Sequence, residues 1–251
     1  YLQERLNHLP DPIRIPVSGL FIPDPMKREF SRQIRALKAS GVRTVKVKVG
    51  RLQANEEIRQ ILNLVDEMGK DLILRLDGNK NLSAETYLAY CRELHHLNVE
   101  YAEEPLRDGE TPPSEAFSWP KASDESLSVY IDSRHPDPSS LPPDIRTVIL
   151  KPGLLAGMSG MFRFTAAAAK RNIQTILSSA FNTGVTLAGL GAFARLAGLP
   201  PATAHGLDTL RYLESDVLME SPSVTEGMLQ IPRELLSGMR LNFHVLTKEN
   251  L

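Results

Sequence analysis

The feature that most constrains the fold of this sequence is the alternation of short apolar runs, typical of β-strands, with longer stretches of helical periodicity. Such alternation is the pattern of βαβ units, in which helices cover a parallel sheet. A chain of 251 residues has the typical length of a barrel of eight such units. We therefore expect an α/β, TIM-like (β/α)8-type barrel. The predicted strands are Ile15–Ile22, Thr44–Val49, Leu72–Leu76, Glu100–Glu103, Lys121–Asp124, Thr147–Leu150, Gln174–Ser178 and Thr203–His205.

The segments between these runs predict the helices and the domain layout. Helical spacing leads up to Gly41 and Gly69, and Ser83 is placed to cap a third helix. Prolines predict shortened connections at 111–120 and 132–143, and helical patterns return at 158–172 and 185–199. We expect a lead-in segment at 1–14, a barrel carrying the site at 15–208, and a tail at 209–251 that packs back on the barrel.

Composition narrows the class of partner. The net charge of −1, with 24% charged and 42% hydrophobic residues, gives no electrostatic reason to bind nucleic acid or an anionic membrane. The most apolar stretch, Thr183–Leu199, is interrupted by Arg195 and is too polar to span a bilayer. A lone Cys91 predicts a buried thiol in a reducing compartment. We expect a small-molecule partner and a cytoplasmic location, or an organelle interior in a eukaryote.

Three acidic residues stand where predicted strands reach the loops: Asp77, Glu103 and Asp124. The strand ends of such a barrel converge on one face, so these carboxylates would meet and repel one another. A hard divalent cation with oxygen ligands relieves that repulsion, and Mg²⁺ suits this set, with Mn²⁺ as a substitute. The structural alternative is that each acid caps the following helix or pairs with a surface lysine.

Three lysines occupy comparable positions. Lys46 and Lys48 lie two residues apart on one strand and therefore point the same way, and Lys151 follows another strand across the barrel. Lysines beside a cation and other ammonium groups lose protons more easily, so one can serve as a base. With Mg²⁺, this set suits proton removal from a carbon next to a carboxylate. The alternatives are an outward-facing pair and a surface lysine at Lys151.

Five short motifs, in order and spacing, resemble the enolase superfamily, in the branch with lysines on both sides of the site. They are KVKVG (46–50), LRLDGN (74–79), YAEEP (101–105), SDES (123–126) and LKPG (150–153). Within that branch, IPVSGL (15–20), LSSAFNTG (177–184) and HGLDT (205–209) resemble the o-succinylbenzoate synthases of menaquinone and phylloquinone biosynthesis. The resemblance implies the modified (β/α)7β form of the barrel.

It also implies a reaction, in which 2-succinyl-6-hydroxy-2,4-cyclohexadiene-1-carboxylate loses water by syn elimination, through a metal-stabilised enediolate, to give o-succinylbenzoate. Lys48 is the expected general base, Lys46 keeps its pKa low, and Lys151 stabilises the enediolate. The expected Mg²⁺ ligands are Asp77, Glu103 and Asp124. Four more residues are expected to support the metal ligands or to face the substrate: Asn79, Glu104, Ser178 and Ser179.

Two other functions stay open. Sister enzymes with the same lysine pair racemise N-acylamino acids, epimerise dipeptides or catalyse cycloisomerisation. A non-catalytic barrel within a fused protein is the second alternative. Members of the superfamily also carry an N-terminal capping domain, and 1–14 is too short to form one. Three alternatives stay open: a longer or fused form of this polypeptide supplies the cap, another chain supplies it, or the cap has been lost, with 1–14 as a candidate remnant of it.

Overall fold

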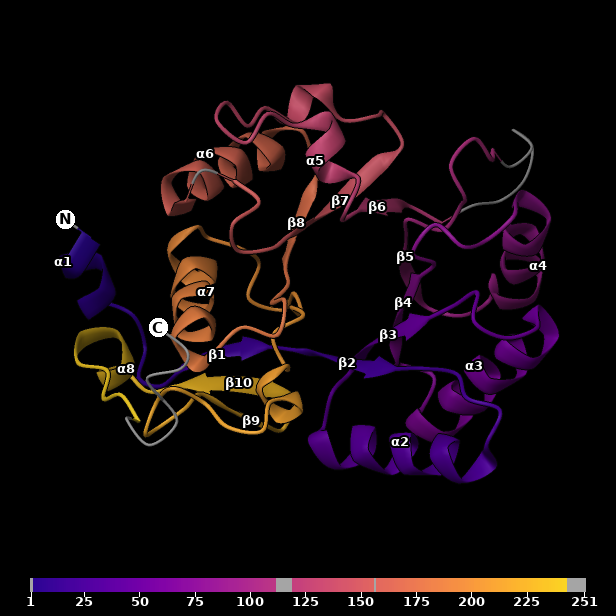
Figure 1. Cartoon of the computed structure of the whole chain (residues 1–251), viewed down its shortest axis with the longest axis horizontal. Coiled ribbons are helices and arrows are strands. Elements are labelled where there is room, and N and C mark those ends of the chain that lie inside the picture. Colours follow the sequence, from indigo (N-terminus) through magenta and orange to yellow (C-terminus); the bar gives the residue numbers. More distant parts are fainter. Residues whose placement is uncertain (1, 112–118, 156, 243–251) are drawn as a thin grey trace, which may run out of the picture.

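The computed structural model describes residues 2–111, 119–155 and 157–242, and a parallel sheet curls around the centre of this part of the chain (Figure 1). Within this sheet each strand pairs with the next one along it in sequence order, and the helices of the described connections lie outside it. This arrangement confirms the predicted α/β barrel class. The seven strands of the described sheet, in spatial order, are β2 (Ser18–Phe21), β3 (Thr44–Lys48), β4 (Ile73–Asp77), β5 (Val99–Glu103), β6 (Lys121–Ser123), β7 (Ile145–Leu150) and β8 (Gln174–Leu177).

The sheet closes through single-residue bridges. The prediction of an eighth strand at Thr203–His205 is wrong: His205 forms a parallel bridge with Val17, and Gly206 forms another with Ser178. The His205 N–H donates to the carbonyl of Pro16 at 2.8 Å, and the Ser18 N–H donates to the carbonyl of His205 at 2.9 Å. Pro16 has no N–H of its own, which limits the ladder on that side. The barrel is therefore completed by one short segment between β8 and β2.

The predicted first strand, Ile15–Ile22, is two strands. β1 (Ile13–Pro16) pairs antiparallel with β10 (Met228–Ile231), which also pairs with β9 (Ser223–Thr225), and only β2 belongs to the barrel. The break falls at Val17, whose N–H donates to the carbonyl of Gly227 at 2.9 Å. The two ends of the described chain thus share one small sheet beside the barrel (Figure 1).

The helices lie outside the curled sheet (Figure 1). Two predicted ends are confirmed: α2 stops at Gly41, which has a φ of 70°, and α4 begins after Ser83, whose Oγ accepts the Thr86 N–H. The proline-rich segment 111–120 lies mostly outside the described residues, and 132–143 contains one short 3-10 turn. The helices are α1 (Leu2–Asn7), α2 (Lys27–Ser40), α3 (Ala54–Met68), α4 (Ala84–Leu94), α5 (Leu127–Tyr130), α6 (Gly157–Lys170), α7 (Gly184–Leu196) and α8 (Glu234–Ser237), with 3-10 turns η1 (Pro138–Ser140) and η2 (Leu210–Tyr212).

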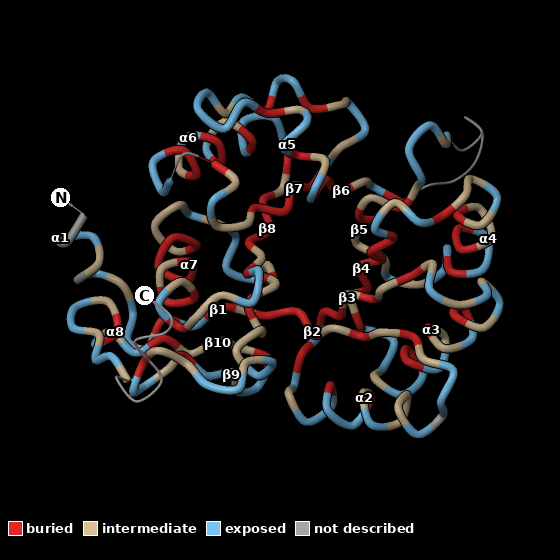
Figure 2. Tube along the Cα trace, in the orientation of Figure 1, coloured by how far each residue is buried: buried red, intermediate tan, exposed pale blue. Residues whose placement is uncertain are grey.

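Two groups of buried apolar side chains support the barrel. The larger fills the space between strands and helices, and Figure 2 shows the buried positions along the strands and the inner helix faces. The smaller group, Tyr101, Ala122, Ile149 and Ile176, lies inside the barrel. Because strand side chains alternate between the two faces, every second residue of each strand points inward. Among the described residues, no helix has the length and apolar character needed to cross a membrane.

Candidate active site

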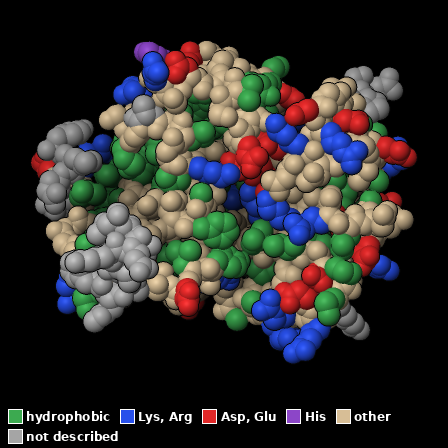
Figure 3. All heavy atoms as spheres, in the orientation of Figure 1, with side chains coloured by type: hydrophobic (Ala, Val, Ile, Leu, Met, Phe, Trp, Pro, Cys, Tyr) green, Lys and Arg blue, Asp and Glu red, His purple; other side chains and the backbone are tan. Residues whose placement is uncertain are grey.

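Strand alternation places six charged side chains on the inner side of the barrel, at the ends of its strands. Lys46, Lys48 and Asp77 lie on β3 and β4, Glu103 ends β5, and Asp124 and Lys151 follow β6 and β7. Lys48, Asp77 and Glu103 are direct neighbours across the ladder. Lysine, arginine and carboxylate side chains gather around a hollow at the centre of the face in Figure 3. All six positions predicted as metal ligands or lysine groups therefore lie at one end of the barrel.

The lysine pair on β3 is bound to the carboxylates of β4 and β5. Lys46 Nζ lies 2.6 Å from Glu103 Oε2 and 3.1 Å from Asp77 Oδ2. Lys48 Nζ lies 2.8 Å from Asp77 Oδ2 and donates to Asn79 Oδ1 at 2.6 Å. Burial opposes the charge on Lys46, but Glu103 and Asp77 outweigh it and raise its pKa above the ordinary value. Lys46 therefore remains a cation, and Lys48 is the lysine of the pair with fewer carboxylate partners.

A second ion pair lies on the other side of the barrel end. Lys151 Nζ is 2.6 Å from Asp124 Oδ2, and about a third of the Lys151 side chain is exposed. Between the two pairs, Glu103 is fully buried. Burial raises the pKa of Glu103 most strongly, Lys46 lowers it, and the nearby charges of Asp77 and Asp124 raise it again. The three carboxylates thus lie near enough to repel one another.

The repulsion among Asp77, Glu103 and Asp124 bears on whether these residues suit a metal ion. Asp77, Glu103 and Asp124 offer oxygen donors only, which is the chemistry that Mg²⁺ prefers, and excess negative charge at one place favours a cation. In the described part of the chain, no group of three or more His, Cys, Asp or Glu side chains is already gathered as a metal site. Lysines instead balance the carboxylates here. The donor chemistry of the three carboxylates suits a hard divalent cation, while lysine ammonium groups hold their oxygens in the structure.

Glu104 supports the neighbouring loop. Its Oε1 accepts the backbone N–H groups of Asp124 at 3.0 Å and Ser126 at 2.7 Å, and its own backbone has a φ of 37°. Glu104 thereby fixes the turn that presents Asp124. Of the two roles expected for Glu104, its contacts favour support of a metal ligand over contact with a substrate.

The loop after β4 is held equally closely. The Asn79 N–H donates to Asp77 Oδ1 at 3.2 Å. Gly78 lies so near Pro105 that a Cβ on it would be 2.7 Å from the Pro105 Cα. Glycine is therefore required where the loops after β4 and β5 touch. This close approach places Asn79 beside the Lys48 ammonium group.

The two serines after β8 have partners within the protein. Ser179 Oγ lies 2.6 Å from Thr209 Oγ1 and also donates to the carbonyl of Gly206, and Ser178 forms the closing bridge. Two backbone N–H groups of the turn that follows also have partners, since that of Ala180 donates to Asn182 Oδ1 and that of Gly184 to Asp216 Oδ1. Within the described part of the chain, neither serine hydrogen bonds to the lysine and carboxylate cluster. Their predicted role in binding substrate remains a prediction.

The sequence did not predict the polar layer that lies beneath this cluster. Arg75 is almost fully buried; its Nε lies 2.6 Å from Glu100 Oε2, and its Nη1 donates to the Ala204 carbonyl at 2.8 Å. Its guanidinium group lies 5.2 Å from the centre of the Tyr101 ring. The sequence does indicate that Arg75 points inward, because it lies two residues before Asp77 on the same strand and so shares the inner face with it.

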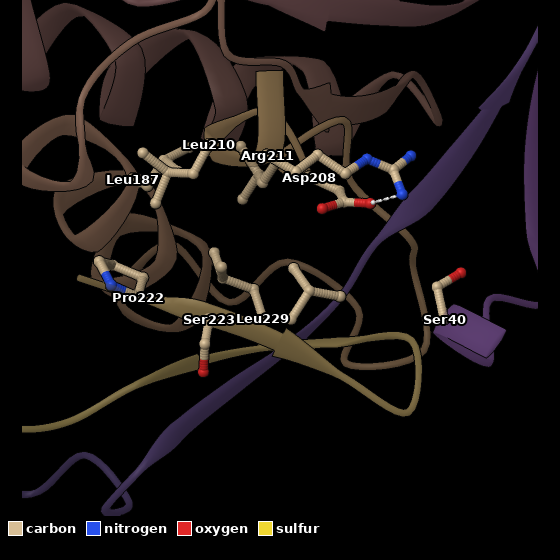
Figure 4. Close-up of a pocket in the computed structure, with 10 residues that line it drawn as sticks. Ser40, Leu187, Asp208, Leu210, Arg211, Pro222, Ser223 and Leu229 are labelled. Atoms are coloured by element: carbon tan, nitrogen blue, oxygen red, sulfur yellow. Dashed lines mark ion pairs between the residues drawn. The ribbon is translucent and has the colours of Figure 1, made fainter. Parts of the chain in front are cut away.

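A cavity of about 280 Å³ lies elsewhere, on the flank of the barrel (Figure 4). Leu187, Leu229 and Pro222 form much of its apolar lining, and Asp208 and Arg211 form an ion pair at 3.2 Å beside it. Its lining includes none of the six charged residues described above. This cavity is therefore separate from the group of lysines and carboxylates at the barrel end.

Comparisons with known proteins identify relatives of this chain. Residues 29–134 match a family model described as Enolase C-terminal domain-like. An o-succinylbenzoate synthase of Klebsiella pneumoniae is 32% identical over 199 residues, covering 76% of this chain and 59% of that protein. The enzyme of the same name from Pasteurella multocida is 27% identical over 212 residues, covering 80% and 60%. The chain thus spans less than two thirds of either relative.

Among solved structures, a muconate lactonizing enzyme from Mycobacterium smegmatis superposes with a TM-score of 0.76. It is 20% identical to this chain, and the match covers 98% of this chain and 68% of the enzyme. At that identity the likeness shows the fold alone. It agrees with the parallel, curled sheet described above.

Proposed function

This chain carries a barrel domain of the enolase C-terminal type, and we propose that it catalyses dehydration of 2-succinyl-6-hydroxy-2,4-cyclohexadiene-1-carboxylate to o-succinylbenzoate. The observation that carries the proposal is the pair of facing groups at the barrel end. Lys48 lies beside Asp77 on one side, and Lys151 lies beside Asp124 on the other. The names of the sequence relatives supply the product, o-succinylbenzoate, and the resemblance of the sequence motifs supplies the substrate.

The proposed reaction uses the lysines in different roles. Lys48, in its neutral form, takes the proton from the ring carbon that bears the carboxylate, and the electron pair moves onto that carboxylate. Lys46 and Lys151 provide positive charge near the developing negative charge. The electrons then return to form the ring double bond, and the hydroxide on the next carbon leaves. Lys48 returns its proton to this hydroxide, which departs as water and leaves an aromatic product.

A divalent cation, when bound by Asp77, Glu103 and Asp124, supplies further positive charge against the substrate carboxylate. Lys46 contacts both Asp77 and Glu103. With a cation on those oxygens, its ammonium group would be free to contact the substrate carboxylate.

Turnover of the cyclohexadiene substrate in the presence of Mg²⁺ tests the proposal. We expect Lys48→Ala to lower the rate by at least about 100-fold, as loss of a general base does. Lys170→Ala, at an exposed position at the end of α6, is the matched control and should keep the wild-type rate. Equal rates for the wild type and Lys48→Ala would contradict the proposal and favour a non-catalytic barrel.

Lysines on both sides of the site also suit a racemase. β3 and β7 are separated by three strands in the sheet, so Lys48 and Lys151 can approach a carbon from opposite directions. A chiral N-succinylamino acid in deuterated water separates the two functions. Deuterium incorporation with inversion would show racemisation, whereas the dehydration proposal predicts none.

A further inference from the structure

A buried carboxylate under the first loop of the site has no role in the mechanism above. Glu57 lies in the first turn of α3 and is fully buried. Lysines balance the carboxylates at the barrel end, whereas the hydrogen-bond donors to Glu57 are neutral. Burying a carboxylate in this way is costly unless hydrogen bonds satisfy its oxygens.

Glu57 accepts hydrogen bonds from three successive backbone groups in the loop after β3. The N–H of Gly50 donates to Oε2 at 2.8 Å, and those of Arg51 and Leu52 donate to Oε1 at 2.7 and 2.6 Å. The hydroxyl of Tyr90, on α4, also donates to Oε2. One side chain therefore binds the whole turn that begins two residues after Lys48.

The loop held by Glu57 contacts the loop that carries Asn79. Gly50 has a φ of 80°, and a Cβ on it would lie 2.9 Å from Leu82 Cδ2 and 3.2 Å from the Cβ of Asn81. Asn79, in that second loop, accepts a hydrogen bond from Lys48 Nζ. The strand end that bears Lys48 and the loop that receives its ammonium group are thus fixed against each other through Gly50.

We propose that Glu57 is a positioning residue that sets the place of the Lys48 ammonium group by holding the Gly50–Leu52 turn. This inference rests on the proposed function for its effect on turnover, and on geometry alone for its effect on Lys48. A displaced base lowers the rate of the chemical step more than it weakens substrate binding, because small errors in geometry act on the reacting atoms.

Glu57→Gln tests the proposal, since glutamine has the same shape but keeps only one acceptor oxygen. Tyr90→Phe is the matched control, because it removes the hydroxyl donor and leaves all three backbone bonds in place. We expect kcat to fall about 10- to 100-fold in Glu57→Gln with little change in KM. Tyr90→Phe should unfold at a lower temperature but keep the wild-type kcat.

A second readout does not depend on turnover. Acetylation of Lys48, measured by mass spectrometry at one pH relative to the exposed Lys170, should be faster in Glu57→Gln than in the wild type or Tyr90→Phe. If the wild type has no dehydratase activity but this labelling still rises in Glu57→Gln alone, the positioning role holds and the proposed reaction fails. Wild-type labelling and kcat in Glu57→Gln, or equal effects of both substitutions, would overturn the positioning role.

Discussion

At the scale of single residues, Lys46 and Lys48 stand two positions apart on one strand, yet their ammonium groups have different partners. Lys46 contacts two carboxylates, whereas Lys48 contacts Asp77 and the neutral amide of Asn79. The chemical difference between the two lysines therefore comes from the neighbouring strands. The two carboxylates favour the charged form of Lys46, and the proposed reaction uses Lys48 for proton transfer.

His205, which closes the barrel, makes stability depend on pH. Burial, followed by the charges of Arg75 and Arg195, lowers its pKa to about 3, and its Nδ1 accepts the Leu177 N–H at 3.1 Å. Below about pH 6.5 the unfolded chain binds a proton that the folded chain excludes, so stability is lost as the pH falls toward 3. Between pH 7.5 and 5 we expect this group to cost about 2 kcal/mol.

Urea unfolding of the wild type and His205→Asn at these two pH values measures the effect. Asparagine offers an acceptor oxygen but does not titrate, so the variant should lose less stability on acidification. The same loss in both proteins would show that another group is responsible.

At the scale of elements, α7 begins at a side chain far along the sequence. Asp216 Oδ1 accepts the N–H of Gly184 at 2.9 Å and that of Val217 at 2.8 Å, and Ser221 donates to its other oxygen. A carboxylate at a helix N-terminus satisfies a free N–H and interacts favourably with the helix dipole. Asp216 thus joins the segment before β9 to the helix that packs against β1 and β10.

Asp216→Ala should lower the free energy of unfolding by about 1 to 2 kcal/mol, the usual cost of losing such a cap. Asp216→Asn keeps an acceptor oxygen, so it should cost less. Thermal and urea unfolding of the two variants compare these values. An alanine variant as stable as the wild type would show that the contact contributes nothing to α7.

The elements also show why the sequence predicted some features and not others. The caps at Gly41 and Ser83 and the charged strand ends depend on neighbouring residues, so a local pattern reveals them. The division at Val17 depends on Gly227 and His205, about 200 residues away, and no local pattern carries that information. The role of Glu57 could not be predicted from the sequence either, because an acidic residue in the first turn of a helix is ordinary.

At the scale of the whole molecule, the barrel gathers opposite charges at one end while its outer core stays apolar. The positions of the lysines and carboxylates followed from the strand pattern, but their pairing did not. The sequence favoured carboxylates facing a metal, whereas in the structure Lys46, Lys48 and Lys151 hold them. This arrangement predicts that metal binding and lysine release occur together.

Calorimetric titration of the folded chain with Mg²⁺ measures whether the three carboxylates bind a cation together. We expect one Mg²⁺ bound per chain, with affinity at least about 10-fold weaker in Glu103→Gln, since removal of a ligand charge weakens the site. Glu67→Gln, at a carboxylate paired with Lys38 on the surface, is the control and should bind as the wild type does. Equal binding by the wild type and Glu103→Gln, or none by either, would show that these carboxylates do not form a metal site.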